Sequence, residues 1–159
     1  PIHKTSELLE EVVSEAVQRF RKRIPQAQIR VAIPDDFVMI AMDATLIEQV
    51  LINLLENAYY HGSSCTPTDL KVYLQNQRAY FQVIDYGKGI SEEQLPHIFD
   101  GSPASPSQSG DSRKGMGIGL SICKTIITAH GGEIKAENHE NGARFTFWLP
   151  LKEEGKDES

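Results

Sequence analysis

One segment, Glu48–Gly62, constrains the fold more than any other part of the chain; it reads EQVLINLLENAYYHG. Asn53 and Asn57 are four residues apart, so on a helix their amides lie about 40° from each other. Glu56 and Tyr60 border the same face. Amide oxygens at the border of a core suit a hard cation such as Mg²⁺, whereas the alternative is that both Asn residues are solvated. The apolar residues in and just before this segment recur at helical steps of three and four, which predicts a core-facing stripe: Leu46, Ile47, Val50, Leu51, Leu54, Leu55 and Ala58.

Length and charge narrow the classes of protein to which the chain can belong. A chain of 159 residues is expected to form one domain. It holds 16 Lys and Arg against 22 Asp and Glu, a net charge of −6, which argues against nucleic acid as a partner. No run of about 18 apolar residues is present, so we expect no direct membrane contact by this segment. The chain begins at Pro1 rather than Met, which is compatible with a fragment of a larger, membrane-anchored parent.

The other segments alternate between helix and strand patterns. Helices segregated from a mostly antiparallel, mixed sheet predict an α+β fold, a two-layer sandwich with the helices on one face. Asp43 is expected to cap the central helix, and Thr5 or Ser6 the N-terminal one. The Asn76-Gln77-Arg78 connection predicts a hairpin, Asn141-Gly142 lies between the last two predicted strands, and Gly131-Gly132 predicts a left-handed cap at the end of the last helix. The predicted order of the main elements is α β β α β β α β β, with helices at 5–23, 44–62 and 115–130 and strands at 29–33, 37–42, 70–75, 79–85, 133–138 and 144–149. An additional short helix is predicted at 92–97.

Residues 1–151 form the predicted domain. Within it, 99–114 is rich in Ser, Gly and Pro, and a loop of this length inside a compact domain is usually a functional lid or disordered; we assign it as the ATP lid. Residues 152–159 are charged and lack apolar side chains, which predicts a disordered tail.

Two glycine motifs carry candidate chemistry. In Asp85-Tyr86-Gly87-Lys88-Gly89-Ile90, a carboxylate at a strand end precedes a tight turn, and it can accept a hydrogen bond from an exocyclic amine such as that of adenine. Gly115, Gly117 and Gly119 alternate just before a predicted helix, where exposed backbone N–H groups favour phosphate. Each motif alone is a weak signal: the first also occurs in plain turns, and the second is not the dinucleotide fingerprint, because no strand leads straight into it.

The ordered set of these signals resembles the ATP-binding catalytic domain of sensor histidine kinases, within the superfamily of gyrase, Hsp90, histidine kinases and MutL. The resemblance covers about Thr5 to Pro150 and includes MDATLIEQVLINLLENA, DYGKGI, IFD, GMGIGLSICKTIITAHGG and GARFTFWLP. It implies a Bergerat-type ATP-binding fold with ATP and Mg²⁺ as cofactors. A potassium-responsive, Kdp-type sensor kinase is a candidate parent.

The resemblance also implies roles for individual residues. Asn57 would hold Mg²⁺, Asn53 would lie near the phosphates, and Glu56 would be a candidate general base, so Glu56 and Asn57 are the expected catalytic residues. Asp85 would bind the adenine amine. The remaining nucleotide contacts would come from the base-binding loop, the start of the lid and the glycine motif: Gly87, Gly89, Ile90, Phe99, Gly115, Met116, Gly117, Ile118, Gly119 and Leu120.

The chain departs from the family pattern at four places. Tyr60, which we still expect at the nucleotide, stands where the family usually has Lys. Phe99 lacks the second Phe and the Arg that usually follow it, and Ala143 stands where Thr is common. The phosphoacceptor helix with its His is absent from the sequence, so this segment alone is not expected to autophosphorylate.

The expected function is transfer of the ATP γ-phosphoryl to a histidine on a separate helical domain, in two-component signal transduction. That dimerisation and phosphoacceptor domain of the same parent and a downstream response regulator are the expected partners, besides ATP and ADP. The alternatives are a nucleotide-binding regulatory module with weak or no phosphotransfer and an anti-sigma-type protein serine kinase. The expected location is the cytoplasmic part of a membrane-anchored bacterial sensor.

Overall fold

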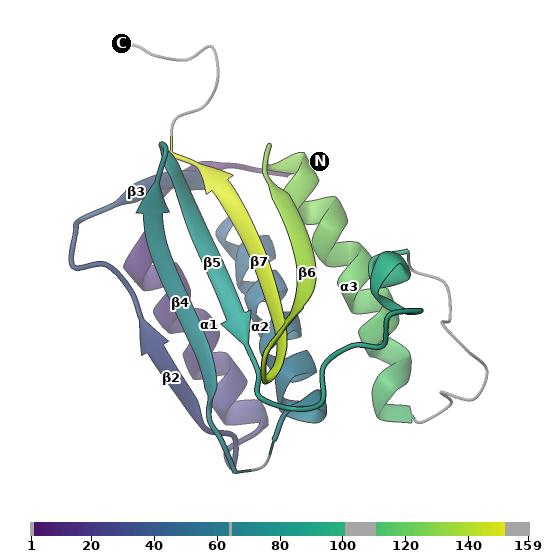
Figure 1. Cartoon of the computed structure of the whole chain (residues 1–159). Coiled ribbons are helices and arrows are strands. Elements are labelled where there is room, and N and C mark those ends of the chain that lie inside the picture. Colours follow the sequence, from purple (N-terminus) through teal and green to yellow (C-terminus); the bar gives the residue numbers. More distant parts are fainter. Residues whose placement is uncertain (1, 64, 101–110, 152–159) are drawn as a thin grey trace.

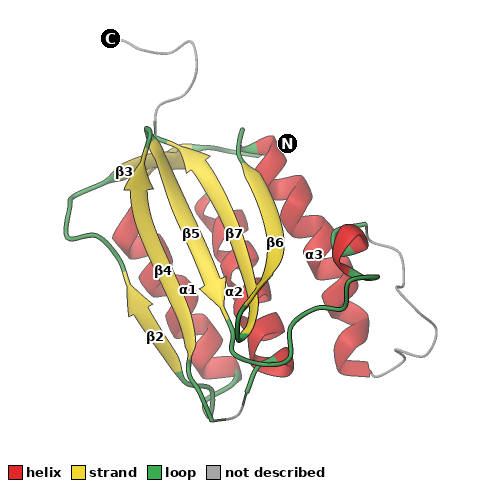
Figure 2. Cartoon of the chain, viewed as in Figure 1, coloured by secondary structure: helices red, strands yellow, loops and turns green. Residues whose placement is uncertain are grey.

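The structure is a computed structural model that describes residues 2–63, 65–100 and 111–151, with 111–118 described by their backbone alone. In this part of the chain, three α-helices cover one face of a five-stranded sheet (Figures 1 and 2). The predicted two-layer α+β fold is therefore confirmed. The predicted disordered tail, 152–159, lies outside the described residues, as do residues 101–110 of the predicted lid.

The sheet is mixed, as predicted. Its strand order is β2-β4-β5-β7-β6, and β2 pairs in parallel with β4 whereas the other neighbours are antiparallel. Alternate residues of β5 turn towards the helices, where the ring of Phe81 stacks on that of Phe147 with 4.5 Å between centroids. The strands are β2 Ile29–Ala32, β4 Thr68–Gln75, β5 Arg78–Ile84, β6 Glu133–His139 and β7 Gly142–Pro150.

Helix α2 is the centre of the helical layer and lies between α1 and α3 (Figure 1). Its predicted stripe is buried except for Leu46, which is partly buried, and Ile47, Leu51 and Leu54 are fully inaccessible to solvent. As predicted, Asp43 caps the helix, with its Oδ1 accepting a hydrogen bond from the Leu46 N–H at 3.4 Å. The helices are α1 Leu9–Arg23, α2 Ala44–His61 and α3 Asp111–Ala129.

The N-terminal helix begins later than predicted. Residues 5–8 form strand β1 (Thr5–Leu8), which pairs antiparallel with β3 (Met39–Met42), and α1 starts only at Leu9. Neither Thr5 nor Ser6 caps the helix, because its N-cap is Leu8, which makes no side-chain capping bond. The helical pattern was misleading here because the pairing partner lies more than 30 residues away in the sequence.

Three other boundaries complete the comparison with the sequence. α3 begins at Asp111, four residues before the predicted start, and the predicted helix 92–97 is reduced to a 3₁₀ turn, η1 (Leu95–His97). The predicted left-handed cap is confirmed, because Gly131 has φ +83° and its N–H donates to the Thr128 carbonyl at 2.9 Å.

None of the described helices is both long enough and apolar enough to cross a membrane.

Candidate functional site

The loop 85–90, which follows β5, lies between the end of α2 and the turn that joins β6 to β7 (Figure 1). Helix α3 contacts α2 at Asn53. Asp85, the first residue of the loop, is only 2% exposed. Its Oδ1 accepts hydrogen bonds from the N–H groups of Gly87 at 3.0 Å and Ala143 at 3.2 Å. Among the described residues, no hydrogen bond reaches its Oδ2. One oxygen therefore orients the carboxylate, and the other is available to a ligand.

Glycine permits the close approach of this loop to its neighbours. A Cβ at Gly87 would lie 2.0 Å from the carbonyl oxygen of His61, the last residue of α2. A Cβ at Gly142, where φ is +152°, would lie 2.3 Å from the carbonyl oxygen of Asp85. Any side chain at either position would push the loop away from α2 or from β7.

The predicted pair of amides lies in the second half of α2. Asn57 is 7% exposed, and no described residue forms a hydrogen bond with its side chain. The Asn53 Nδ2 contacts the Cys123 Sγ of α3 at 3.8 Å, and a Cβ at Gly119 would lie 3.4 Å from the Asn53 amide. Among the described residues, the Asn57 amide is not one of the fully buried polar groups that lack a partner, so it reaches solvent and is open to water or a ligand.

Cys123 is fully buried behind Asn53. Burial raises the pKa of its thiol to about 12, and the hydrogen bond from Asn53 opposes this rise. The thiol is therefore neutral at physiological pH, so the Asn53 amide packs against an uncharged group.

The structure does not bring Glu56 together with these groups. The Glu56 Oε2 lies 2.9 Å from the Arg23 Nη2 at the end of α1, although it accepts no well-aligned hydrogen bond. The Glu56 carboxylate thus contacts α1, whereas the Asn53 amide contacts α3 on the other side of α2. Tyr60 is 46% exposed, with its ring edge against Tyr59 at 5.1 Å. The nucleotide roles of Glu56 and Tyr60 stay predictions.

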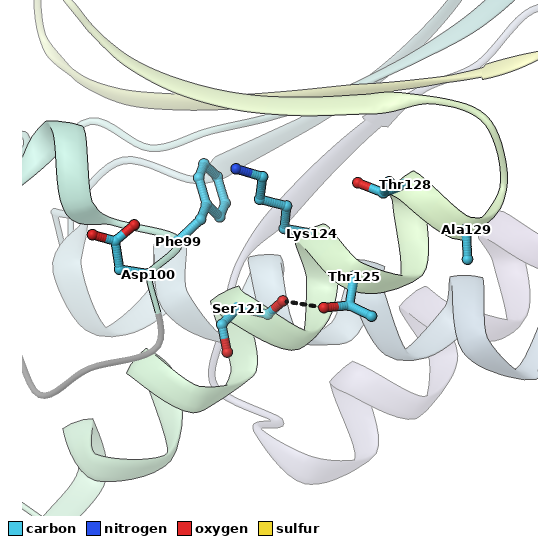
Figure 3. A pocket seen from close by; sticks show the side chains of 7 residues that line it. All are labelled: Phe99, Asp100, Ser121, Lys124, Thr125, Thr128 and Ala129. Carbon is cyan, nitrogen blue, oxygen red and sulfur yellow. Dashed lines mark hydrogen bonds between the residues drawn. The ribbon is translucent and has the colours of Figure 1, made fainter.

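Phe99 lines a pocket of about 520 Å³ beside α3. Figure 3 shows Phe99 and Asp100 on one side of this pocket and the α3 residues Ser121, Lys124 and Thr125 on the other. The ring of Phe99 also meets Phe145 of β7 edge-on at 6.1 Å, which anchors the chain where the predicted lid begins.

The predicted phosphate-binding glycines lie within α3 rather than before it. Gly115, Met116, Gly117 and Ile118 belong to the part of the helix described by its backbone alone, so their contacts stay predictions. Gly119 faces Asn53, whereas the side chain of Leu120 is 4% exposed and belongs to the core.

A second group of polar residues supports the loop 85–90 from the open face of the sheet. The Arg30 guanidinium donates two hydrogen bonds to Asp69, at 2.7 and 3.1 Å, and Asp69 also accepts one from the hydroxyl of Tyr86. Burial would raise the pKa of Asp69, but these hydrogen bonds outweigh it and hold the pKa below its usual value. The same bond with Asp69 raises the pKa of Tyr86, so Tyr86 stays a neutral donor.

Sequence reasoning missed the residues of β6 and β7 that hold this loop. His139 contacts the Asp85 carbonyl, Asn138 contacts the backbone of Ile90, and Ala143 binds Asp85 through its backbone. The partners are 48 to 58 positions apart. The Asn141-Gly142 turn indicated the hairpin but not what its tip would contact.

Comparison with known proteins identifies the family. Residues 42–153 match the family described as "Histidine kinase-, DNA gyrase B-, and HSP90-like ATPase", which is more than half of the chain. The chain belongs to this family. The resemblance predicted from its motifs is thereby confirmed.

The relatives of this ATPase domain are sensor kinases. It is 49% identical over 150 residues to the sensor protein KdpD of Clostridium acetobutylicum, covering 94% of the domain and 17% of that protein. It is 36% identical to the adaptive-response sensory kinase SasA of Microcystis aeruginosa, covering 91% of the domain and 37% of that protein. The chain thus spans well under half the length of these relatives.

A solved structure agrees in fold and extent. The catalytic domain of histidine kinase ThkA, in a nucleotide-free form, superposes with a TM-score of 0.80 at 31% identity, covering 94% of this chain and 97% of that one. The domain is thus homologous to the ATP-binding catalytic domains of sensor histidine kinases, and nothing in these comparisons favours the regulatory-module or serine-kinase alternatives.

Proposed function

We propose that this domain binds Mg·ATP at the site around Asp85 and Asn57 and transfers the γ-phosphoryl group to a histidine of a separate helical domain of the same parent protein. The acceptor nitrogen would form a bond to the γ-phosphorus as the bond to the β,γ-bridging oxygen breaks, and ADP would leave. The observation that carries this proposal is the environment of Asp85. A buried carboxylate, oriented by two backbone N–H groups and open at one oxygen, suits the exocyclic amine of adenine.

The amides of α2 fit the metal in this proposal. Mg²⁺ prefers oxygen ligands and is usually bound through one or two protein groups together with substrate phosphates and waters. Asn57 would hold the ion through its amide oxygen, which no described residue engages. When bound, the ion would neutralise charge on the phosphates. Asn53, fixed between Gly119 and Cys123, would orient the phosphate chain.

The chain's own contribution is positioning, since phosphoryl transfer requires little covalent chemistry from the protein. Asp85 would fix the base, with Gly87, Gly89 and Ile90 around it, and the backbone from Gly115 to Leu120 would approach the phosphates. The base role of Glu56 has weaker support, because its carboxylate lies next to Arg23. A Glu56→Gln variant that keeps full phosphotransfer would remove Glu56 from the catalytic residues.

We infer the partners from the relatives, which are sensor kinases and much longer than this domain. The parent would be a bacterial, membrane-anchored sensor of the Kdp type, with this domain on its cytoplasmic side. The helical domain would pass the phosphoryl group on to a response regulator.

The direct test of binding is calorimetric titration of the domain with ADP, with and without Mg²⁺. We expect micromolar affinity that Mg²⁺ strengthens. Absence of binding under both conditions would contradict the nucleotide site.

The test of transfer uses the domain together with the separately produced helical segment of the parent and ATP labelled at the γ-position. We expect acid-labile, base-stable label on the helical segment, as a phosphohistidine gives. Label that is stable to acid would instead indicate a hydroxyl acceptor and favour the serine-kinase alternative.

A further inference from the structure

The last two residues of β6, Asn138 and His139, contact opposite ends of the loop that carries Asp85. Figure 1 shows the turn between β6 and β7 beside this loop. Neither residue belongs to the motifs that indicated the function. Both lie on the edge strand of the sheet, where a polar side chain can be solvated by water instead of contacting the protein.

Asn138 holds the far end of the loop through both groups of its amide. Its Oδ1 accepts a hydrogen bond from the Ile90 N–H at 2.8 Å, and its Nδ2 donates to the Ile90 carbonyl at 2.8 Å. Gly89 lies against the same amide, because a Cβ there would be 2.8 Å from the Asn138 Oδ1. This pair of bonds fixes the backbone of Ile90 in position and direction.

His139 holds the near end. Its Nε2 is 2.8 Å from the Asp85 carbonyl oxygen, which can only accept, so Nε2 carries the proton. Its Nδ1 accepts from the Asn141 N–H at 3.3 Å, which requires the same neutral tautomer. The ring also meets Tyr86 edge-on at 5.4 Å, and Asp69 holds the Tyr86 hydroxyl. The Asp85 carbonyl group and the Tyr86 side chain that follows it are therefore restrained.

We propose that Asn138 and His139 are positioning residues for nucleotide recognition, which hold the loop 85–90 so that the free oxygen of Asp85 is aimed at the exocyclic amine of adenine. This inference rests on the proposed nucleotide site. The two hydrogen bonds at Oδ1 set the rotation of the carboxylate, whereas Asn138 and His139 set where the backbone that carries it lies. A carboxylate held in place accepts from an amine and rejects a carbonyl oxygen, so the pair acts on the choice of base.

Comparing the affinities for nucleotides with different bases distinguishes a positioning role of Asn138 and His139 from a purely structural one. ADP carries an amine at the six-position of its base, and IDP carries a carbonyl oxygen there. We expect the wild type to bind ADP at least tenfold more tightly than IDP. A residue that only stabilises the fold would change both affinities alike.

The experiment measures ADP and IDP affinity by calorimetry, and the melting temperature, for the wild type and four variants. We expect Asn138→Ala and His139→Ala each to weaken ADP binding about threefold to tenfold and IDP binding less, so that discrimination falls. His139→Gln, which keeps an N–H donor, should recover ADP affinity to within about twofold of the wild type. Asn138→Asp should not recover it, because a carboxylate oxygen would face the Ile90 carbonyl.

Lys135→Ala is the matched control. Lys135 is exposed on the same strand, and no described residue hydrogen-bonds its side chain, so its removal should leave both affinities and their ratio unchanged. Unchanged discrimination in Asn138→Ala and His139→Ala, or an equal loss of ADP and IDP binding, would overturn the positioning role. A wild type that binds no ADP would overturn the proposed function itself, and the inference with it.

Discussion

His130, next to the C-terminal end of α3, accepts a hydrogen bond at its Nε2 from the backbone N–H of Asp43, 3.0 Å away. Asp43 is the N-cap of α2, so one imidazole joins the end of one helix to the start of another. The other ring nitrogen, Nδ1, donates to the Ile126 carbonyl at 2.8 Å. Both bonds require the neutral ring, which is 1% exposed.

This relationship predicts lower stability in acid. Burial lowers the pKa of His130 below its ordinary value of 6.5, against the raising effect of its bond with Ile126. The unfolded chain therefore binds this proton at a higher pH than the native one. The contribution of His130 to the free energy of unfolding is complete above about pH 6.5 and declines as the pH falls from there towards the native pKa.

Urea unfolding of wild type and His130→Gln at pH 7.5, 6.0 and 5.0 measures this contribution. The variant should be less stable by about 1–3 kcal/mol at pH 7.5 and show a smaller decline. Equal slopes in both proteins would contradict this account.

Asp85→Asn should lower ADP affinity at least tenfold, about 1.4 kcal/mol. The asparagine Oδ1 can still accept from Gly87 and Ala143, so the fold is kept, but an NH₂ group then faces the adenine amine. Titration with ADP measures the loss. Asp36→Asn, in the exposed turn before β3, is the control. Unchanged affinity of the Asp85 variant would remove this carboxylate from the base site.

Asn57→Ala should reduce the effect of Mg²⁺ on nucleotide binding while the domain stays folded. The amide has no described hydrogen-bond partner, so its loss removes a metal ligand but no hydrogen bond within the described part of the protein. ADP titrations with and without Mg²⁺ give the ratio of affinities, which should move towards one. Gln49→Ala on the exposed side of the same helix should keep the wild-type ratio. An equal response to Mg²⁺ in the Asn57 variant would exclude the metal role.

Gly87→Ala should damage both binding and stability. Its Cβ would lie 2.0 Å from the His61 carbonyl oxygen, so the loop or the end of α2 must shift. Overpacking of this kind costs about 1–3 kcal/mol of unfolding free energy. Chemical unfolding and ADP titration measure the two effects. A variant with native stability and affinity would show that the loop does not need this approach to α2.

The two thiols should react at very different rates. Cys65 is exposed, whereas Cys123 is fully buried and burial raises its pKa to about 12. At pH 8, a thiol reagent should modify Cys65 quickly and Cys123 only through opening of the fold. Mass spectrometry of the labelled protein distinguishes them, and Cys65→Ser should abolish the fast phase. Because Cys123 contacts Asn53, ADP should slow its modification further. Fast labelling of both thiols would contradict the buried environment.

Local patterns in the sequence were sufficient to predict most of the helices, strands and turns of the fold. The apolar stripe of α2 and the cap at Asp43 follow from the spacing of neighbouring residues, and both are confirmed. The left-handed cap at Gly131 and the two hairpins also depend on residues close in sequence. The motif at Asp85 was visible because a strand end and its turn are contiguous.

Tertiary structure alone decided what these local elements contact. Residues 5–8 are a strand because β3 supplies a partner, which overrides a helical pattern. The Glu56 carboxylate lies next to Arg23 because α1 packs on that side of α2, so two residues one position apart in the sequence, Glu56 and Asn57, have different surroundings. The support of Asp85 by Asn138, His139 and Ala143 likewise depends on the β6–β7 hairpin folding back across the sheet. The sequence by itself determined the elements and the candidate ligand groups, because these depend on near neighbours. Which groups face one another depended on packing between segments more than 30 residues apart in the sequence, which no local pattern encodes.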